Sequence, residues 1–252
     1  RGAGGRGVSG VVDAIRAFSA NSSPLDFWIV FQNWGLFWTG LQNTLILLVI
    51  SLIVGGAIAV PLAIVRATRV SVLNPLAYAF IYLIRGTPLL VQLYIIYYGL
   101  AQFGALRKSA AWVVLQDPWW CALIAFSIST SAYTAEIFRA AIVDTPRGEV
   151  EAAIAAGMSR RLAMRRIILP SAFRRALPAY GNEVIFNLQS TALASTVTVI
   201  DVMGAARLLN NKYYLASEGF LTAAVIYIAI VLVITRMFRF LERRLFRHLP
   251  QS

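Results

Sequence analysis

The chain has 252 residues, of which 59% are hydrophobic and only 13% are charged, and its formal net charge is +12. A soluble domain of this length needs about a quarter of its residues charged to cover its surface, so a soluble globular fold is disfavoured. The excess of positive charge flanks apolar segments and does not alternate with aromatic residues along a stripe, so we expect no nucleic-acid partner.

Apolar stretches long enough to cross a bilayer recur along the chain. About 20 apolar residues are needed to cross a hydrocarbon core of about 30 Å. An aromatic-rich segment, residues 27–38, precedes the first stretch and is interpreted as an interfacial helix. The sequence therefore predicts an all-α integral membrane fold, with a single transmembrane domain over residues 24–248. The predicted spans are residues 40–65, 76–100, 120–143, 176–198 and 219–238.

Residues 1–23 precede this domain and are rich in glycine and serine. This composition is typical of disordered segments. The tail lacks the apolar run that forms the core of a signal peptide, so we expect no signal peptide there. We assign the tail no function.

The basic residues are divided unequally between the two sets of loops. The loops at 66–74, 139–175 and 236–252 contain 15 of the 23 lysines and arginines, whereas the opposite loops contain only Arg107, Lys108, Arg207 and Lys212. Loops rich in lysine and arginine stay in the cytoplasm. We therefore expect a multi-pass protein with its N-terminus outside and its C-terminus in the cytoplasm, in contact with anionic lipid headgroups.

No set of side chains suited to catalysis or metal binding is apparent. The chain has one cysteine, Cys121, within an apolar run, and one histidine, His248, in the basic C-terminal tail. Metal sites and catalytic triads need several such groups together. A phosphate-binding loop of the form GxxxxGK[ST] is also lacking. We therefore expect a chain that is not an enzyme and holds no metal or cofactor itself.

Residues 144–170 are too polar to cross a bilayer, and the charge distribution places them in the cytoplasm. Glu149 and Glu151 open an alanine-rich segment, where carboxylates complement the dipole of a helix. Gly157 follows that segment, as a glycine that ends a helix does. A second, basic helix follows, and we expect Leu169-Pro170 to turn the chain toward the fourth span. The segment predicts two short helices joined at a turn.

The spacing within this loop resembles the EAA loop of permeases from bacterial ATP-binding cassette (ABC) importers. That pattern is Glu-Ala-Ala, three residues, Gly, nine residues and Ile-x-Leu-Pro. Three other segments, at 85–92, 132–139 and 176–184, are similar to the polar amino-acid permeases of this family. The resemblance covers about residues 35–247 and is strongest to the M-type subunits for histidine, arginine, ornithine and opines. The residues that match the EAA pattern are Glu151, Ala152, Ala153, Gly157, Ile167, Leu169 and Pro170.

This resemblance implies a subunit of a type I importer in the bacterial inner membrane. In such importers two permease chains form the path, and two ATP-binding cassette subunits, which bind ATP and Mg²⁺, each accept one EAA loop. A periplasmic binding protein delivers the solute. The second permease chain is expected to differ from this one, giving a heterodimer.

The resemblance also implies a polar and basic amino acid, such as histidine, arginine, ornithine or lysine, or an opine as the solute. The alternative within the same family is a neutral or acidic amino acid. A different class, the ion-coupled secondary transporter, predicts internal inverted repeats. We find no such repeat, and that class would leave the EAA-like loop without a purpose.

A charge within a span costs about 2.5–3.5 kcal/mol and therefore needs a reason. Glu183 lies in the fourth span, where it would pair with a basic solute or, alternatively, with an arginine of the protein. Asn187 and Ser190 follow on the same polar helix. Related basic amino-acid permeases often carry an aspartate where Ser190 stands. Its absence puts a complete solute site in this subunit in doubt and favours a heterodimer.

Arg85 lies in the second span beside Gly86 and Pro88, which can break the helix and free backbone groups to line a cavity. Arg85 would meet the carboxylate of the solute, or pair with Glu183 or with Glu136. The predicted solute path comprises Arg85, Thr87, Gln92, Glu183, Asn187 and Ser190.

Glu136 and Arg139 lie near the end of the third span, where an ion pair or a gate is expected. Tyr133 is interpreted as a packing residue.

Overall fold

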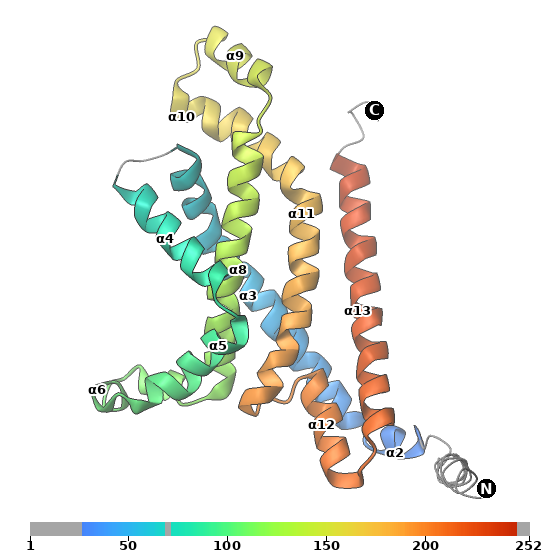
Figure 1. Ribbon diagram of the computed structural model, residues 1–252. Helices are drawn as coiled ribbons and strands as arrows, with labels where there is room; N and C mark the ends of the chain where they lie inside the picture. The colour runs from blue at the N-terminus through green and yellow to red at the C-terminus, as the bar shows by residue number, and fades with distance from the viewer. Residues whose placement is uncertain (1–26, 69–71, 246–252) are drawn as a thin grey trace, which may run out of the picture.

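The computed structural model describes residues 27–68 and 72–245, and every regular element in these two ranges is a helix (Figure 1). The predicted tail, residues 1–23, lies outside the described residues. So do Arg69, Arg247 and His248, together with both ends of the predicted domain.

Three helices are long and apolar enough to cross a membrane. They are α3 (Trp34–Thr68), α8 (Pro118–Val143) and α13 (Ala216–Leu245), and two bent helix pairs raise the number of candidate spans to five. The predicted first, third and fifth spans each lie within one of these helices. A short helix, α2 (Phe27–Gln32), precedes α3 in the segment predicted to be interfacial.

The segment predicted as the second span is two helical pieces joined at a sharp bend. The bend of 101° lies between α4 (Leu73–Gly86) and α5 (Leu89–Tyr94), and α5 continues through the π-helix η1 (Ile95–Gly99) and the 3₁₀-helix η2 (Leu100–Gln102). Thr87 is extended at the bend because the ring of Pro88 disfavours a helical conformation in the residue before it. Two short helices, α6 (Gly104–Arg107) and α7 (Trp112–Leu115), follow before α8.

After α8 the chain forms a separate helical loop and then returns. This loop contains α9 (Arg147–Ala155), α10 (Arg160–Ala163) and the π-helix η3 (Met164–Ile168). The return helix is α11 (Leu169–Ser190), which continues as the 3₁₀-helix η4 (Thr191–Val197). A bend of 41° separates this run from α12 (Val202–Tyr213). The segment between the predicted fourth and fifth spans is therefore mostly helical.

The expected turn at Leu169-Pro170 is wrong, because the helical run continues from Arg160 to Val197. Pro170 stands in the first turn of α11, directly after the wide turn of η3. A proline inside a regular helix clashes with the preceding turn, and a local π-turn relieves such clashes by shifting the hydrogen-bond register.

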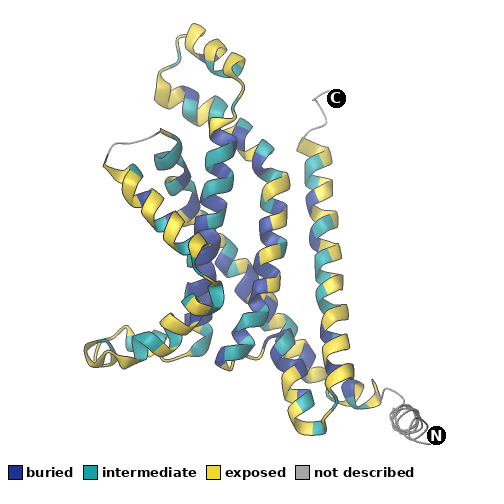
Figure 2. Ribbon diagram, in the orientation of Figure 1, coloured by how far each residue is buried: buried dark blue, intermediate teal, exposed yellow. Residues whose placement is uncertain are grey.

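Helices α3, α4, α5 and α11 pack against α8. Two thirds of its most apolar window is buried (67%), compared with 11% for α13, so α8 is central and α13 is peripheral (Figure 2). Cys121 is fully buried in α8 as a core residue. Helix α3 approaches α8 closely at Gly55, where an added Cβ would meet the side chain of Thr130 and lie 2.9 Å from the carbonyl oxygen of Ser127.

The basic segments gather at one end of the molecule. Helices α9 and α10 lie at the same end as the C-terminal end of α13, whereas α2, α6 and α12 lie at the opposite end (Figure 1).

Adjacent glycines of α3 provide a matched test of this packing. We expect Gly55→Ala to lower the thermal unfolding midpoint of the purified protein in detergent, because overpacking costs about 1–3 kcal/mol. Gly56→Ala should leave the midpoint unchanged or raise it, since no atom lies within 4 Å of its added Cβ and alanine favours the helix by about 1 kcal/mol. Equal midpoints for the two variants would contradict the close contact.

Candidate functional site

The loop between α8 and α11 ends its first helix in the way that the sequence predicts. Gly157 has a φ of +75°, and its amide donates to the carbonyl of Ile154 at 2.9 Å. The amide of Met158 donates to Ala153 at 3.1 Å. These two bonds form a Schellman motif, which satisfies the last carbonyls of a helix and requires the left-handed conformation that glycine adopts at little cost. The prediction that Gly157 ends this helix is confirmed.

The residues of the EAA pattern come together around a groove. A cavity of about 490 Å³ lies between α9 and the start of α11. Glu151 lies on α9 and is exposed, and Leu169 begins α11. The pattern residues that line the cavity are Ala152, Ala153, Ile167 and Pro170. The fold therefore builds one compact surface from positions that are up to 18 residues apart in the sequence.

The bend in the second span leaves carbonyl groups that a continuous helix would satisfy. The side-chain amide of Gln92 donates to the carbonyl of Ile84 at 2.8 Å and to the carbonyl of Thr87 at 3.1 Å. The same nitrogen lies 2.9 Å from the hydroxyl of Thr87, which donates to Leu83 at 3.0 Å. A carbonyl without a donor is costly in hydrocarbon, and without Gln92 the carbonyl of Ile84 would keep a longer bond of 3.4 Å from the hydroxyl of Thr87. Gln92 therefore holds the bend together, and its contact with a solute stays a prediction.

Two neighbouring cavities meet at Arg85. One, of about 350 Å³, is lined by Arg66, Tyr78, Arg85, Tyr133 and Glu136 among others. The second, of about 340 Å³, lies beside Arg85, Thr87, Ser129, Tyr133 and Phe186. Arg85 and Gly86 are common to both, as is Tyr133.

Tyr133 is more than the packing residue expected from the sequence. The guanidinium carbon of Arg85 lies 5.1 Å from the centroid of its ring, within the range of a cation–π contact. The ring is therefore part of the cavity wall and positions the arginine. One signal was available: Tyr133 precedes Glu136 by three residues, which places the two on the same face of a helix.

Glu183 is buried and has a neutral partner. Glu183 is 8% exposed, and its Oε1 accepts a hydrogen bond of 3.1 Å from the hydroxyl of Thr130 on α8. Within residues 27–68 and 72–245, ion pairs join Arg139 to Glu136 and Arg175 to Glu149. Within these residues, Glu183 therefore has no arginine of its own chain as an ion-pair partner.

The other two predicted path residues of α11 bond within the chain. The amide of Asn187 donates to the hydroxyl of Ser51 on α3 at 2.9 Å. The hydroxyl of Ser190 donates to the carbonyl of Phe186 at 2.9 Å. Their contact with a solute stays a prediction.

The expected ion pair between Glu136 and Arg139 is confirmed. Two nitrogens of Arg139 contact Oε1 of Glu136, Nε at 2.7 Å and Nη2 at 2.5 Å. Since Glu136 also lines the cavity beside Arg85, this pair borders the candidate path. The gate role stays a prediction.

Comparison with known proteins identifies relatives over most of the chain. The family described as "Binding-protein-dependent transport system inner membrane component" matches residues 59–247. The nopaline transport system permease protein NocM of Agrobacterium fabrum is 42% identical over 214 residues, covering 84% of this chain and 89% of NocM. The histidine/lysine/arginine/ornithine transport system permease protein HisM of Escherichia coli K12 is 42% identical over 219 residues, covering 86% of this chain and 92% of HisM.

Solved structures show the same fold. A crystal structure of an amino acid ABC transporter with histidines matches with a TM-score of 0.79 and 33% identity, over 88% of this chain and 100% of that chain. The MetNI methionine ABC transporter matches with a TM-score of 0.63 and 16% identity, over 88% of this chain and 99% of that chain, which shows likeness of fold alone.

The role of Gln92 in the bend can be tested by substitution. We expect Gln92→Leu to lower the free energy of unfolding by about 1 kcal/mol or more, because two partly buried carbonyls lose their donor. The contribution of Gln92 comes from its N–H donors, because its buried Oε1 has no hydrogen-bond partner among the described residues. Gln102→Leu, at an exposed glutamine farther along the same segment, is the matched control. Thermal unfolding that is equal for both variants would rule out this role.

Proposed function

This chain belongs to the family of binding-protein-dependent transport system inner membrane components and is a permease subunit of an ABC importer for amino acids and opines, and we propose that its solute is basic. The observation that carries the proposal is the 42% identity to permeases named for nopaline and for histidine, lysine, arginine and ornithine. Every solute in these names carries a basic nitrogen group in its side chain.

The buried carboxyl of Glu183 supports a basic solute. Within the described part of the chain it has a hydroxyl partner, Thr130, and no ion-pair partner. Burying a carboxylate without an opposite charge is costly, so a cation that enters the path gains an attraction there. We propose that Glu183 attracts the basic group and that Arg85, beside two cavities, meets the carboxylate of the solute. Thr87, Asn187 and Ser190 would border the same path.

We propose that the chain lies in the bacterial inner membrane with its C-terminus and its α9–α10 loop in the cytoplasm. The gathering of basic segments at one end of the fold supports this orientation. The opposite end, with α2, α6 and α12, would then face the periplasm.

We propose three kinds of partner for this subunit. A second, different permease would complete the path, as Ser190 suggests. Two ATP-binding cassette subunits would bind ATP and Mg²⁺, and one of them would dock on the groove between α9 and α11. A periplasmic binding protein would deliver the solute. The groove between α9 and the start of α11 supports the docking role, because four residues of the pattern line it.

The charge of the solute can be tested with L-arginine and its neutral isostere L-citrulline in the reconstituted transporter. We expect Glu183→Gln to reduce the preference for L-arginine over L-citrulline by roughly 30-fold, because losing one partner of a buried charge pair costs about 2 kcal/mol or more. Since the binding protein is unchanged, its own selectivity does not alter this comparison. Glu242→Gln, at the far end of α13, serves as the control. An unchanged preference would remove Glu183 from the recognition of the cation.

The docking role of Gly157 can be tested with Gly157→Asp. No atom lies within 4 Å of an added Cβ, and aspartate tolerates the left-handed conformation, so the spans should remain folded. We expect ATP hydrolysis to continue while solute uptake falls at least tenfold, by analogy with roughly 1–3 kcal/mol of coupling between two sites. Gly104→Asp, at the opposite end of the molecule, is the control. Uptake by the Gly157 variant at the rate of the unmodified protein would count against docking at this surface.

A further inference from the structure

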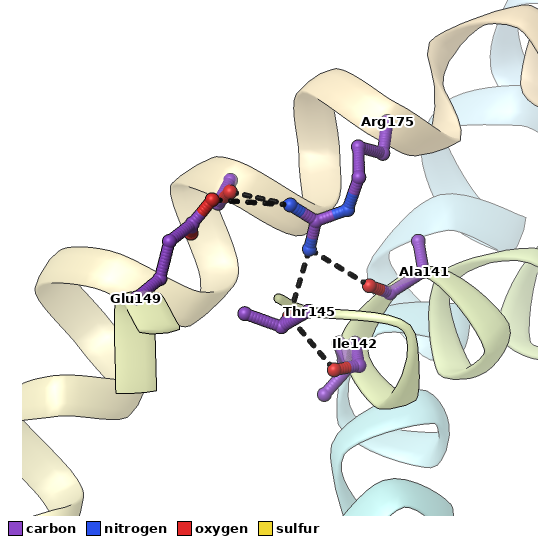
Figure 3. A network of polar contacts seen from close by, with 6 residues as sticks. Ala141, Ile142, Thr145, Glu149 and Arg175 are labelled. Atoms are coloured by element: carbon purple, nitrogen blue, oxygen red, sulfur yellow. Dashed lines mark hydrogen bonds and ion pairs between the residues drawn. The ribbon is translucent and has the colours of Figure 1, made fainter. Parts of the chain in front are cut away.

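One arginine joins the docking loop to α8, which lines the cavities beside Arg85, and to α11, which carries Glu183. Arg175 lies in the second turn of α11, and its guanidinium points toward the junction between α8 and α9 (Figure 3). Nη2 donates to the carbonyl of Ala141 at 3.1 Å and to the hydroxyl of Thr145 at 2.7 Å. Nη1 donates to Ser171 on α11 itself at 2.5 Å and lies 3.7 Å from a carboxylate oxygen of Glu149 on α9.

The contact with Ala141 closes the carboxyl end of α8. The helical donor for this carbonyl would be the amide of Thr145, but that amide bonds Ile142 at 3.3 Å instead. The last carbonyls of a helix need donors from outside it, and a positive charge at this end also complements the helix dipole. Arg175 meets both needs, so its bond to α8 is firmer than a contact between exposed side chains.

Thr145 extends this contact into the connection before α9. Its hydroxyl accepts from Arg175 and donates to the carbonyl of Ile142 at 2.8 Å. Since α8 ends at Val143 and α9 begins at Arg147, fixing Thr145 determines where α9 leaves α8. The ion pair with Glu149 is longer and partly exposed, so it adds less.

The elements that meet at Arg175 carry the proposed machinery. Helix α8 carries Tyr133 and Glu136 on a cavity wall, and α11 carries Glu183. Helix α9 carries the start of the EAA pattern and buries a single residue, Ala153. Apolar burial therefore contributes little to holding α9 in place, and the polar contacts at its first turn carry a larger share.

We propose that Arg175 is a positioning residue for energy coupling, which transmits displacement of α9 by a docked ATPase subunit to α8 and α11. This inference rests on the proposed docking of the EAA loop. In this role Arg175 touches neither the solute nor ATP, and it acts through the direction in which α9 leaves α8.

The experiment measures solute moved per ATP hydrolysed by the complete transporter in liposomes, with labelled L-arginine, L-histidine and nopaline as probes. We expect Arg175→Gln to lower this ratio about tenfold, within the range typical for coupling between two sites, while ATP hydrolysis changes less than about twofold. Arg175→Lys should give an intermediate ratio, because one ammonium cannot reproduce the fork of the guanidinium. Arg239→Gln, at an exposed arginine of α13 near the same end, should keep the original ratio.

A double variant separates coupling from general loss of stability. Thr145→Val keeps the shape of the side chain but removes the hydroxyl that Arg175 bonds. If the two residues act as one unit, Arg175→Gln with Thr145→Val will be no worse in coupling ratio than Arg175→Gln alone. Additive losses, or lower transport in strict proportion to lower ATP hydrolysis and protein yield, would reduce Arg175 to a structural role and overturn the proposal.

A measurement that needs no solute tests the role of Arg175 separately from the identity of the solute. A cysteine replaces Ser129 on the cavity wall, in a Cys121→Ala background, and its labelling by a water-soluble maleimide is followed with and without trapped nucleotide. We expect nucleotide to change the labelling rate when Arg175 is present and to have no effect in Arg175→Gln. If labelling responds but none of the probes is transported, the proposed solute is wrong; an equal response in both proteins overturns the role of Arg175.

Discussion

A carbonyl that leaves its helix within hydrocarbon has to find a donor from the protein, and the second span depends on this constraint. Pro88 and the extended Thr87 interrupt the helix, and the side-chain amide of Gln92 reaches back to Ile84 and Thr87. With these carbonyls satisfied, the chain can bend by 101° within the segment predicted as the second span. The cavities around Arg85 lie at this bend, so the candidate path exists because the interruption is stabilised.

Other polar side chains of the described helices also satisfy polar groups of the chain. Asn43 donates to the carbonyl of Ile200, Asn187 bonds Ser51, and Asp201 accepts from the amide of Gly204 at the start of α12. Arg85 and Glu183 differ from these groups, because the first faces a ring and the second a single hydroxyl. Charged groups that the fold leaves with neutral partners are available for a charged solute, and Arg85 in addition lines two cavities.

The sequence was informative where a local pattern decides the structure, and less so where distant segments meet. Span positions follow from apolar length, and the end of α9 follows from the left-handed conformation at Gly157. The expected turn at Leu169-Pro170 failed because the π-helix before it accommodates the proline, which residue type alone does not reveal. Arg175 counted only as one of many basic loop residues. Its contact with Ala141 spans 34 positions and depends on how α11 packs beside α8, so no local pattern could show it.

Hydrogen bonds hold the chain just before α9 and close α9 at its other end. At one end, Thr145 and Arg175 join it to α8 and α11; at the other, the Schellman bonds of Gly157 and Met158 close the helix. Between them only Ala153 is buried. A helix with little apolar contact can shift as a unit without opening a core, whereas hydrogen bonds at its ends resist stretching over a few tenths of an ångström. In the proposed coupling, α9 would transmit displacement through its N-terminal end, which Arg175 holds.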